Sequence, residues 1–391
     1  MPPHGDATRS PFFLTDRMHI SPQHMPQGFY LGLMSGTSLD GVDAVLADLS
    51  AAQPRVLACG SLPYADALRA EILALQPVGD NELDRAARLA QQLARLYAEV
   101  CQLALAQAGV SAAQVVAVGC HGQTVRHAPQ AGYTVQLADL ALLAELTGID
   151  VVGDFRRRDL AAGGQGAPLV PAAHQAWFGD AHEARVVLNL GGIGNLTRLD
   201  PALPVIGFDT GPGNMLMDAW IADCQPGARF DAGGAWAASG RCVPALLADC
   251  LADPYFAAPP PKSTGRELFS LDWLHARLAA HPGLAAADVQ RTLLQLTVSS
   301  AAQAIAQHAP ATRALYVCGG GALNPLLMAE LAAALPHCRV SATDALGVPA
   351  MQVEALAFAW LAQRFMQRLP GNLPAVTGAT GGRVLGALYP A

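Results

Sequence analysis

The feature that most constrains the fold is a pattern that occurs twice, in which a glycine-rich polar turn joins two apolar runs. The first copy covers residues 30–49 and reads YLGLMSGTSLDGVDAVLADL. The second starts with residues 185–190 (RVVLNL), passes through GGIGN and continues into residues 196–199. Two apolar runs joined by such a turn are typical of a β-hairpin. Because each hairpin opens a series of alternating strands and helices, the repeat predicts a duplicated α/β fold with a cleft between its halves.

The first turn has two interpretations. It is either an ordinary hairpin turn or a cradle for a nucleotide's phosphates and metal, since it offers unshielded backbone N–H groups, hydroxyls and carboxylates. It is not a Walker loop, because no Lys follows the glycines and no helix pattern starts there. The second copy favours the phosphate interpretation, because a nucleotide in the cleft would have one turn from each half on its phosphates.

Length and composition limit the remaining possibilities. A chain of 391 residues with 52% hydrophobic content is globular and long enough for two to three domains. A net charge of −7 argues against a nucleic-acid partner, and the lack of an apolar run of about 18 residues argues against a membrane span. The eight cysteines are scattered without a CxxC pair, which favours reduced thiols in a cytoplasmic protein.

Three segments are expected along the chain. Residues 1–28 are rich in Pro and His and lack an apolar core, so they predict a disordered or mobile extension and no signal peptide. Residues 29–175 form the predicted N-terminal domain with the first phosphate loop, and residues 176–391 form the C-terminal domain with the second.

Periodicity predicts the main elements. Strands are expected at 55–62, 115–119, 151–153, 185–190, 196–199, 205–208 and 314–318. Helices are expected at 65–75, 81–108, 137–147, 215–222, 293–308 and 351–367, with Gly109 ending the second of them. Polar residues follow several strands, notably His121 and Gln123, Asp154 and Arg156, and Asp209. Open α/β sheets place their ligands at such strand ends.

Seven motifs in this order resemble the anhydro-N-acetylmuramic acid kinases. They are GLMSGTSLDGVD (32–43), HGQT (121–124), DFR with GQGAPLVP (154–156 and 164–171), NLGGIGN (189–195), DTGPGN (209–214), PKSTGREL (261–268) and CGGGALN (318–324). The resemblance implies an actin-like ATPase fold, ATP and Mg²⁺ as cofactors, and assembly into a homodimer. It also implies that water opens the 1,6-anhydro ring of anhydro-N-acetylmuramate while O6 receives the γ-phosphoryl group. The product, N-acetylmuramate 6-phosphate, belongs to cell-wall recycling.

Three carboxylates are the catalytic candidates. By resemblance Asp209 matches the general base, although an N-cap or Asx-turn role is the alternative. Asp154 lies where other sugar kinases of this fold carry their base, but the three arginines beside it predict a salt-bridged carboxylate that shapes the sugar pocket. Glu354 lies in an otherwise apolar helix, and the resemblance assigns it to the sugar site. The choice between Asp209 and Asp154 as base stays open.

The binding residues form four predicted groups. The first phosphate loop comprises Gly36, Thr37, Ser38, Leu39, Asp40, Gly41, Val42 and Asp43, with Asp40 organising Mg²⁺ through water. The second phosphate loop comprises Gly191, Gly192, Gly194 and Asn195, and the adenosine side comprises Gly319, Gly320, Gly321 and Asn324. The sugar candidates are His121, Gln123, Arg156, Gln165 and Asn214, with Arg156 suited to the lactyl carboxylate. Lys262, Ser263 and Thr264 form either a lid or a plain exposed loop.

Two other functions compete with this hypothesis. One is a different actin-fold enzyme, such as a hydroxyacid or simple hexose kinase, against which the HGQT and GQGAPLVP motifs argue. The other is a nucleotide-gated sugar sensor or structural actin-like protein, against which the carboxylate pair Asp209 and Glu354 argues.

Overall fold

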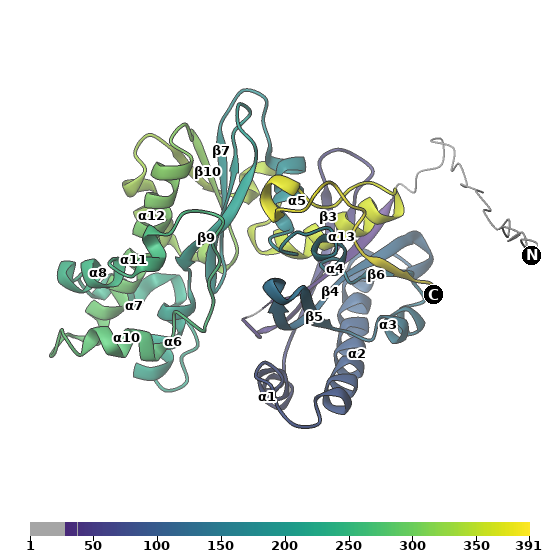
Figure 1. Cartoon of the computed structure of the whole chain (residues 1–391), viewed down its shortest axis with the longest axis horizontal. Coiled ribbons are helices and arrows are strands. Elements are labelled where there is room, and N and C mark those ends of the chain that lie inside the picture. Colours follow the sequence, from purple (N-terminus) through teal and green to yellow (C-terminus); the bar gives the residue numbers. More distant parts are fainter. Residues whose placement is uncertain (1–27, 37) are drawn as a thin grey trace, which may run out of the picture.

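The computed structural model describes residues 28–36 and 38–391, which form two mixed β-sheets flanked by helices (Figure 1). The predicted N-terminal extension lies outside the described residues except for Gly28, and so does Thr37. Within the described part of the chain, no helix is both long and apolar enough to cross a membrane.

The first sheet contains seven strands. These are β1 (Phe29–Ser35), β2 (Gly41–Asp48), β3 (Arg55–Pro63), β4 (Val115–Ala128), β5 (Tyr133–Leu137), β6 (Val151–Gly153) and β12 (Ala387–Tyr389). Their order is β12-β6-β4-β1-β2-β3, and β5 pairs with β4. Strands β1, β2 and β3 form an antiparallel meander, whereas β4 runs parallel to both β1 and β6.

The second sheet repeats this arrangement. Its strands are β7 (Arg185–Leu190), β8 (Ile193–Leu199), β9 (Ile206–Pro212), β10 (Ala314–Cys318) and β11 (Arg339–Ala342), in the order β11-β10-β7-β8-β9. Strands β7, β8 and β9 form the antiparallel meander, and β10 runs parallel to β7 and β11. The predicted α/β class, with two duplicated domains as in the actin-like ATPase fold, is therefore confirmed.

Helices cover both sheets. They are α1 (Asp66–Ala74), α2 (Glu82–Ala108), α3 (Leu140–Thr147), α4 (Arg157–Leu160), α5 (Val170–Phe178), α6 (Met215–Cys224), α7 (Ala235–Ser239), α8 (Pro244–Leu251), α9 (Pro254–Ala257), α10 (Leu271–Leu278), α11 (Ala286–His308), α12 (Pro325–Ala334), α13 (Val353–Met366) and α14 (Pro374–Thr377). Short 3₁₀ turns include η4 (Ala232–Gly234), η5 (Gly320–Leu323) and η7 (Ala350–Gln352). The C′ glycine predicted after α2 is present, because Gly109 has φ 65°.

Helix α13 packs directly on the first sheet. Alternate residues of β1 face opposite sides, so that Tyr30 packs with α13 and Leu31 packs with α2. A Cβ atom on Gly32 would overlap the carbonyl of Ala355, and one on Gly119 would overlap the carbonyl of Phe358. These two glycines therefore let the helix backbone lie against β1 and β4.

The C-terminal segment corrects the predicted domain division. Strand β12 pairs with β6, and α13 packs on β1 and β4, although both follow the second sheet in the sequence. The predicted second domain, residues 176–391, therefore includes a segment that returns to the first sheet.

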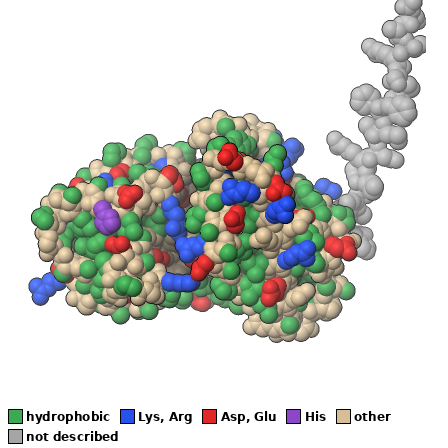
Figure 2. Space-filling model, turned by 90° about the horizontal axis from the view of Figure 1, so that it is seen from below, with side chains coloured by type: hydrophobic (Ala, Val, Ile, Leu, Met, Phe, Trp, Pro, Cys, Tyr) green, Lys and Arg blue, Asp and Glu red, His purple; other side chains and the backbone are tan. Residues whose placement is uncertain are grey.

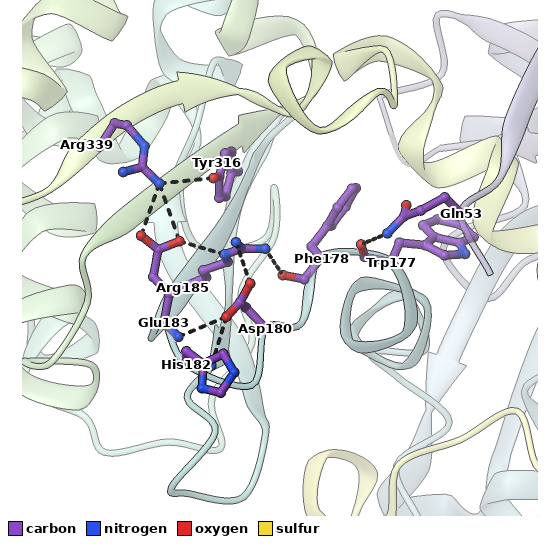
Figure 3. A network of polar contacts seen from close by, with 9 residues as sticks. All are labelled: Gln53, Trp177, Phe178, Asp180, His182, Glu183, Arg185, Tyr316 and Arg339. Carbon is purple, nitrogen blue, oxygen red and sulfur yellow. Dashed lines mark hydrogen bonds and ion pairs between the residues drawn. The ribbon is translucent and has the colours of Figure 1, made fainter.

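The connection between the sheets, from α5 to β7, is fixed by a polar network (Figure 3). The Asp180 carboxylate accepts the backbone N–H groups of His182 and Glu183 and pairs with Arg185 at 2.8 Å. Glu183 pairs with Arg185 and with Arg339 of β11. At the other end, Gln53 donates to the carbonyl of Trp177 at the end of α5. The linker is thus anchored to both halves.

Candidate active site

The first glycine turn rests on the HGQT segment. The structure places this segment inside β4, which continues to Ala128 rather than ending at the predicted Gly119. His121 Nδ1 lies 3.2 Å from the carbonyl of Ser35, and the Ser35 hydroxyl donates to the carbonyl of Gly122. Gln123 Nε2 donates to the carbonyl of Gly36 at 3.2 Å. HGQT therefore holds the backbone of the turn in place.

The second turn has a matching support. The backbone N–H of Gly213 donates to the carbonyl of Gly192, and that of Asn214 donates to the carbonyl of Gly191. The Asn214 side chain donates to the carbonyl of Leu190 at 2.9 Å. The DTGPGN motif therefore supports the turn between β7 and β8, and the prediction that Asn214 binds the sugar is not supported by this geometry.

The glycines of the turns differ in what surrounds them. A Cβ atom would meet nothing closer than 3.6 Å at Gly36 or Gly320, and nothing closer than 3.8 Å at Gly191 or Gly192. These four positions leave room for a ligand beside the backbone, which is the space that a phosphate needs. Figure 2 shows a hollow between the two lobes, with Lys and Arg side chains gathered along it.

Several predicted nucleotide contacts have packing roles instead. Leu39 and Val42 are 2% and 1% exposed and belong to the core of the first domain. A Cβ on Gly41 would overlap the Leu62 carbonyl, one on Gly194 would lie 2.8 Å from the Thr210 hydroxyl, and one on Gly321 would lie 2.5 Å from Leu190. Gly319 has φ 78° and lies against Asn189. The Asn324 side chain caps α12 by accepting the Leu327 N–H.

Asp209 lies in the cleft beside the second turn. It is part of β9, which runs to Pro212 instead of ending at the predicted Phe208, and it pairs in register with Asn195 of β8. Its carboxylate accepts the backbone N–H of Thr264 at 3.0 Å, and its backbone carbonyl accepts the Tyr255 hydroxyl at 2.7 Å. Burial raises the pKa of Asp209 to about 6, the Thr264 N–H opposes this, and the charge of Glu267 adds to it. A carboxylate with such a pKa can act as a base near neutral pH.

The predicted lid is thereby connected to Asp209. The Lys262 carbonyl accepts the Asp209 N–H, and Lys262 Nζ donates to the carbonyls of Tyr255 and Phe256. The Thr264 hydroxyl is buried with no hydrogen-bond partner among the described residues. The loop therefore fixes the Asp209 side chain and leaves a polar atom for a ligand beside it.

Glu354 lies where the two sheets meet. Burial raises the pKa of Glu354, and a hydrogen bond with Asn189 of β7 lowers it. The negative charge of Asp43 raises this pKa further, whereas the positive charge of Arg156 lowers it. Burial likewise raises the pKa of Asp43 on β2. The other side-chain atom of Asn189, Oδ1, is buried with no partner among the described residues. Glu354, Asp43 and Asn189 thus offer a ligand hydrogen-bond acceptors, and Arg156 offers it a positive charge.

Arg156 is held by the first domain. Its Nε and Nη2 atoms lie 3.2 and 2.8 Å from His121 Nε2, and Nη1 donates to the carbonyl of Gly166 at 2.9 Å. The loop that carries Gly166 is fixed by the buried Asp159, which accepts the Gly166 N–H. Gln165 of the same loop is exposed. His121 uses both ring nitrogens within the protein, and Gln123 is 0% exposed, so neither predicted sugar contact is free to bind one directly.

Asp154 directly follows β6 and lies beside the β4–β5 pair. Its carboxylate is held by Arg157, with Nε at 2.8 Å from each oxygen, and it lines a cavity with Gln136 and Tyr389 on the β4–β5 side. Its φ of 58° is unusual for a residue other than glycine. This geometry supports the scaffold interpretation and does not support Asp154 as the base.

A second acidic group was missed from the sequence. The pKa of Asp218 on α6 is raised to about 7 by burial and by the negative charges of Asp40 and Asp231. The positive charge of Arg266 partly opposes this shift. Arg266, on the loop before α10, also reaches across to the carbonyl of Ser38 at 3.4 Å. Asp218 occupies the first turn of the helix that follows DTGPGN, and this position next to a motif is the signal that would have identified it.

Comparisons with known proteins agree with this geometry. A family model described as anhydro-N-acetylmuramic acid kinase matches residues 28–391. A curated relative of that name from Cupriavidus pinatubonensis is 58% identical over 92% of this chain and 98% of its own. Another from Bordetella petrii is 59% identical over 94% of this chain and 97% of its own.

Solved structures are more distant. The activator of 2-hydroxyisocaproyl-CoA dehydratase from Clostridium difficile, with bound ADPNP, aligns with a TM-score of 0.47 at 10% identity, covering 87% of this chain and 96% of its own. A ROK glucokinase from Streptomyces griseus, with glucose and AMPPNP, aligns with a TM-score of 0.39 at 16% identity, covering 85% of this chain and 99% of its own. The family match covers nearly the whole chain, and it confirms the resemblance read from the motifs. The chain belongs to the anhydro-N-acetylmuramic acid kinase family.

Proposed function

We propose that this kinase uses ATP to convert 1,6-anhydro-N-acetylmuramate and water into N-acetylmuramate 6-phosphate and ADP, a step of peptidoglycan recycling. Family membership supports the substrate, and the observation that carries the chemistry is Asp209, a half-buried carboxylate beside the second turn with a pKa raised to about 6. Asp209 takes a proton from water as the water oxygen bonds to C1. The C1–O6 bond breaks, O6 attacks the γ-phosphorus, and ADP leaves.

The phosphates fit between the two turns. Gly36 on one side and Gly191 and Gly192 on the other leave open space beside the backbone, and Gly320 of η5, which is also open, would face the adenosine. Arg156 and Glu354 hold the sugar, with the Arg156 guanidinium on the lactyl carboxylate. Closure of the halves excludes water that would otherwise attack ATP.

Asp40 and Asp218 are the residues that would hold Mg²⁺. The described residues contain no cluster of three or more His, Cys, Asp or Glu that could hold a metal ion alone. Mg²⁺ in a kinase keeps several waters and takes one or two carboxylates together with phosphate oxygens, and Asp40 and Asp218 are close enough for the charge of one to raise the pKa of the other. Mg²⁺ bound there supplies charge neutralisation for the phosphoryl group. Dimerisation and a cytoplasmic location stay predictions.

The activity is tested by incubating the protein with Mg-ATP and the anhydrosugar. We expect equal amounts of ADP and a ring-opened 6-phosphorylated sugar, and ADP without sugar product would contradict the proposal. A parallel reaction with glucose tests the simple hexose kinase, for which we expect no product.

The base is tested by Asp209→Asn. Because the amide cannot accept the proton, kcat should fall by about 100-fold or more while ATP binding is retained. Asp154→Asn is the matched control and should lose less, since both oxygens of Asp154 are already bound by Arg157. Near-normal turnover by the Asp209 variant, with a large loss in the Asp154 variant, would make Asp154 the base.

A further inference from the structure

We propose that His121 is a positioning residue that holds Arg156 for the sugar and ties it to the turn that binds the phosphates, so that nucleotide and sugar bind cooperatively. This inference rests on the proposed function, because it takes the sugar's carboxylate as the ligand of Arg156. It gives the HGQT segment a role between the two substrates rather than in contact with either.

The hydrogen bonds of His121 fix its tautomer. Arginine can only donate, so the bonds from Arg156 Nε and Nη2 make His121 Nε2 an acceptor. Nδ1 then carries the proton and donates to the carbonyl of Ser35. Burial and the positive charge of Arg156 lower the pKa of His121 to about 3, which keeps the ring neutral at physiological pH. A neutral ring with both nitrogens engaged cannot serve as a proton carrier for the reaction.

The ring itself is held by packing. His121 is 6% exposed, and its centroid lies 4.7 Å from that of Phe358 on α13. Helix α13 also carries Glu354 one turn earlier, so His121 is braced against the element that supplies the sugar-site carboxylate. The ring therefore has one orientation, set by its packing and its two hydrogen bonds.

Arg156 keeps donors for a ligand. A guanidinium has five N–H groups, and three of them are used on His121 and Gly166. The two that remain have no bond among the described residues. Burial lowers the pKa of Arg156 to about 10, so the group stays charged near neutral pH, and the charge of Glu354 opposes that shift. Arg156 is thus a fixed cation suited to a carboxylate.

The connection to the nucleotide is short. Ser35, whose carbonyl accepts the His121 N–H, directly precedes Gly36, the first open glycine of the turn. Two further bonds, Ser35 hydroxyl to Gly122 and Gln123 to Gly36, fix the same turn to β4. Phosphates that order the turn therefore also order His121, and through it Arg156, which predicts mutual strengthening of binding.

A double-mutant cycle on His121→Phe and Arg156→Ala tests this route. Phenylalanine keeps the ring packing against Phe358 and removes both hydrogen bonds. We expect His121→Phe to raise the sugar KM by about 10-fold or more, with a smaller change in kcat and in the KM for ATP. If His121 acts through Arg156, the double variant should match Arg156→Ala alone within about 3-fold. Additive losses would overturn the inference, as would a change in the pH profile of kcat.

Binding measurements give an independent readout. The Kd of the sugar is measured by calorimetry with and without a non-hydrolysable ATP analogue; the wild-type ratio should be about 5-fold or more and should fall towards 1 in His121→Phe. An unchanged ratio would overturn the inference. His127→Phe is the control, since this exposed histidine of the same strand bonds to Thr134 and not to Arg156.

Two checks keep the outcomes separate. Analogue binding and thermal melting show whether His121→Phe is folded, and His121→Gln, which keeps a donor and an acceptor, should recover part of the sugar KM. If the wild-type protein makes no phosphorylated sugar, the proposed function itself is refuted. This result does not depend on any His121 variant, so it is distinct from a failure of the inference.

Discussion

At the scale of single residues, environment separates carboxylates that look alike in the sequence. Asp209 is partly buried and has one backbone donor, so its pKa is raised to about 6. Asp154 is engaged by Arg157 on both oxygens. Asp218 lies near another carboxylate, Asp40, and its pKa rises to about 7. These differences support the roles proposed above: a base for Asp209, a scaffold for Asp154 and a cation site for Asp218.

The pKa of Asp209 predicts the pH dependence of the reaction. The base must be ionised, so kcat should fall as the pH drops through about 6, and should level off above it. Glu267→Gln removes a neighbouring negative charge that raises this pKa, so the acid limb of the pH–rate profile should move to lower pH. Glu145→Gln, an exposed change on α3, is the control that should leave the limb in place. A limb that does not move in Glu267→Gln would contradict the assigned cause.

Candidate residues could be selected from the sequence, but the orientation of their side chains could not. Asp209, Glu354 and Arg156 could be selected from their positions and the family resemblance. The amides of Gln123 and Asn214 were expected on the sugar, yet both bond to backbone carbonyls of the turns. A sequence does not show whether an amide faces a ligand or its own chain. Arg266 was missed because its partner, Ser38, is distant in the sequence.

At the scale of elements, the contact between α13 and the first sheet depends on two glycines. Gly32 on β1 and Gly119 on β4 leave the helix backbone in direct contact with the strands. The same helix carries Glu354 in its first turn and Phe358 against His121. The approach of the helix therefore positions Glu354 and Phe358 as well as packing the core.

Gly32→Ala should destabilise the fold strongly. The added methyl group would overlap backbone atoms of Ala355, which cannot move as a side chain could, so we expect a loss of about 3 kcal/mol or more in the free energy of unfolding. Denaturant unfolding measures it. Gly79→Ala is the control, because its Cβ would meet nothing closer than 4.0 Å, and it should change the stability by less than about 1 kcal/mol. Equal stabilities of the two variants would contradict this packing account.

Several strands followed from their patterns, and those that differ from the expected bounds have a common cause. Strands β6, β7 and β10 have the predicted bounds because each is a short apolar run. Strands β4 and β9 continue past their apolar residues because β5 and β8 supply hydrogen-bonding partners. Strand β12 has only three residues, and it is a strand because it pairs with β6. Local periodicity does not show which distant segments of the chain will pair.

At the scale of the whole molecule, polar contacts tie the two halves together at more than one place. The linker network of Asp180, Glu183 and Arg185 fixes one end of the connection (Figure 3). Near the phosphate turn, Arg266 of the second half reaches the Ser38 carbonyl of the first. Its loop also supplies the Thr264 N–H to Asp209. The loop that contacts Asp209 therefore also contacts the first half of the molecule.

Arg266→Ala should weaken closure and its coupling to chemistry. Without this contact, the closed state with Mg-ATP and sugar is less populated, and kcat/KM for the sugar should fall by about 10-fold. Small-angle scattering with a non-hydrolysable ATP analogue and the sugar should show a decrease in the radius of gyration for the wild type and a smaller decrease for the variant. The ratio of ADP to sugar product should rise above one, because water reaches the γ-phosphate in the open cleft. Arg229→Ala, at an exposed arginine with no side-chain bond among the described residues, should behave as the wild type. Equal compaction of the Arg266 variant and the wild type would show that the loop does not control closure.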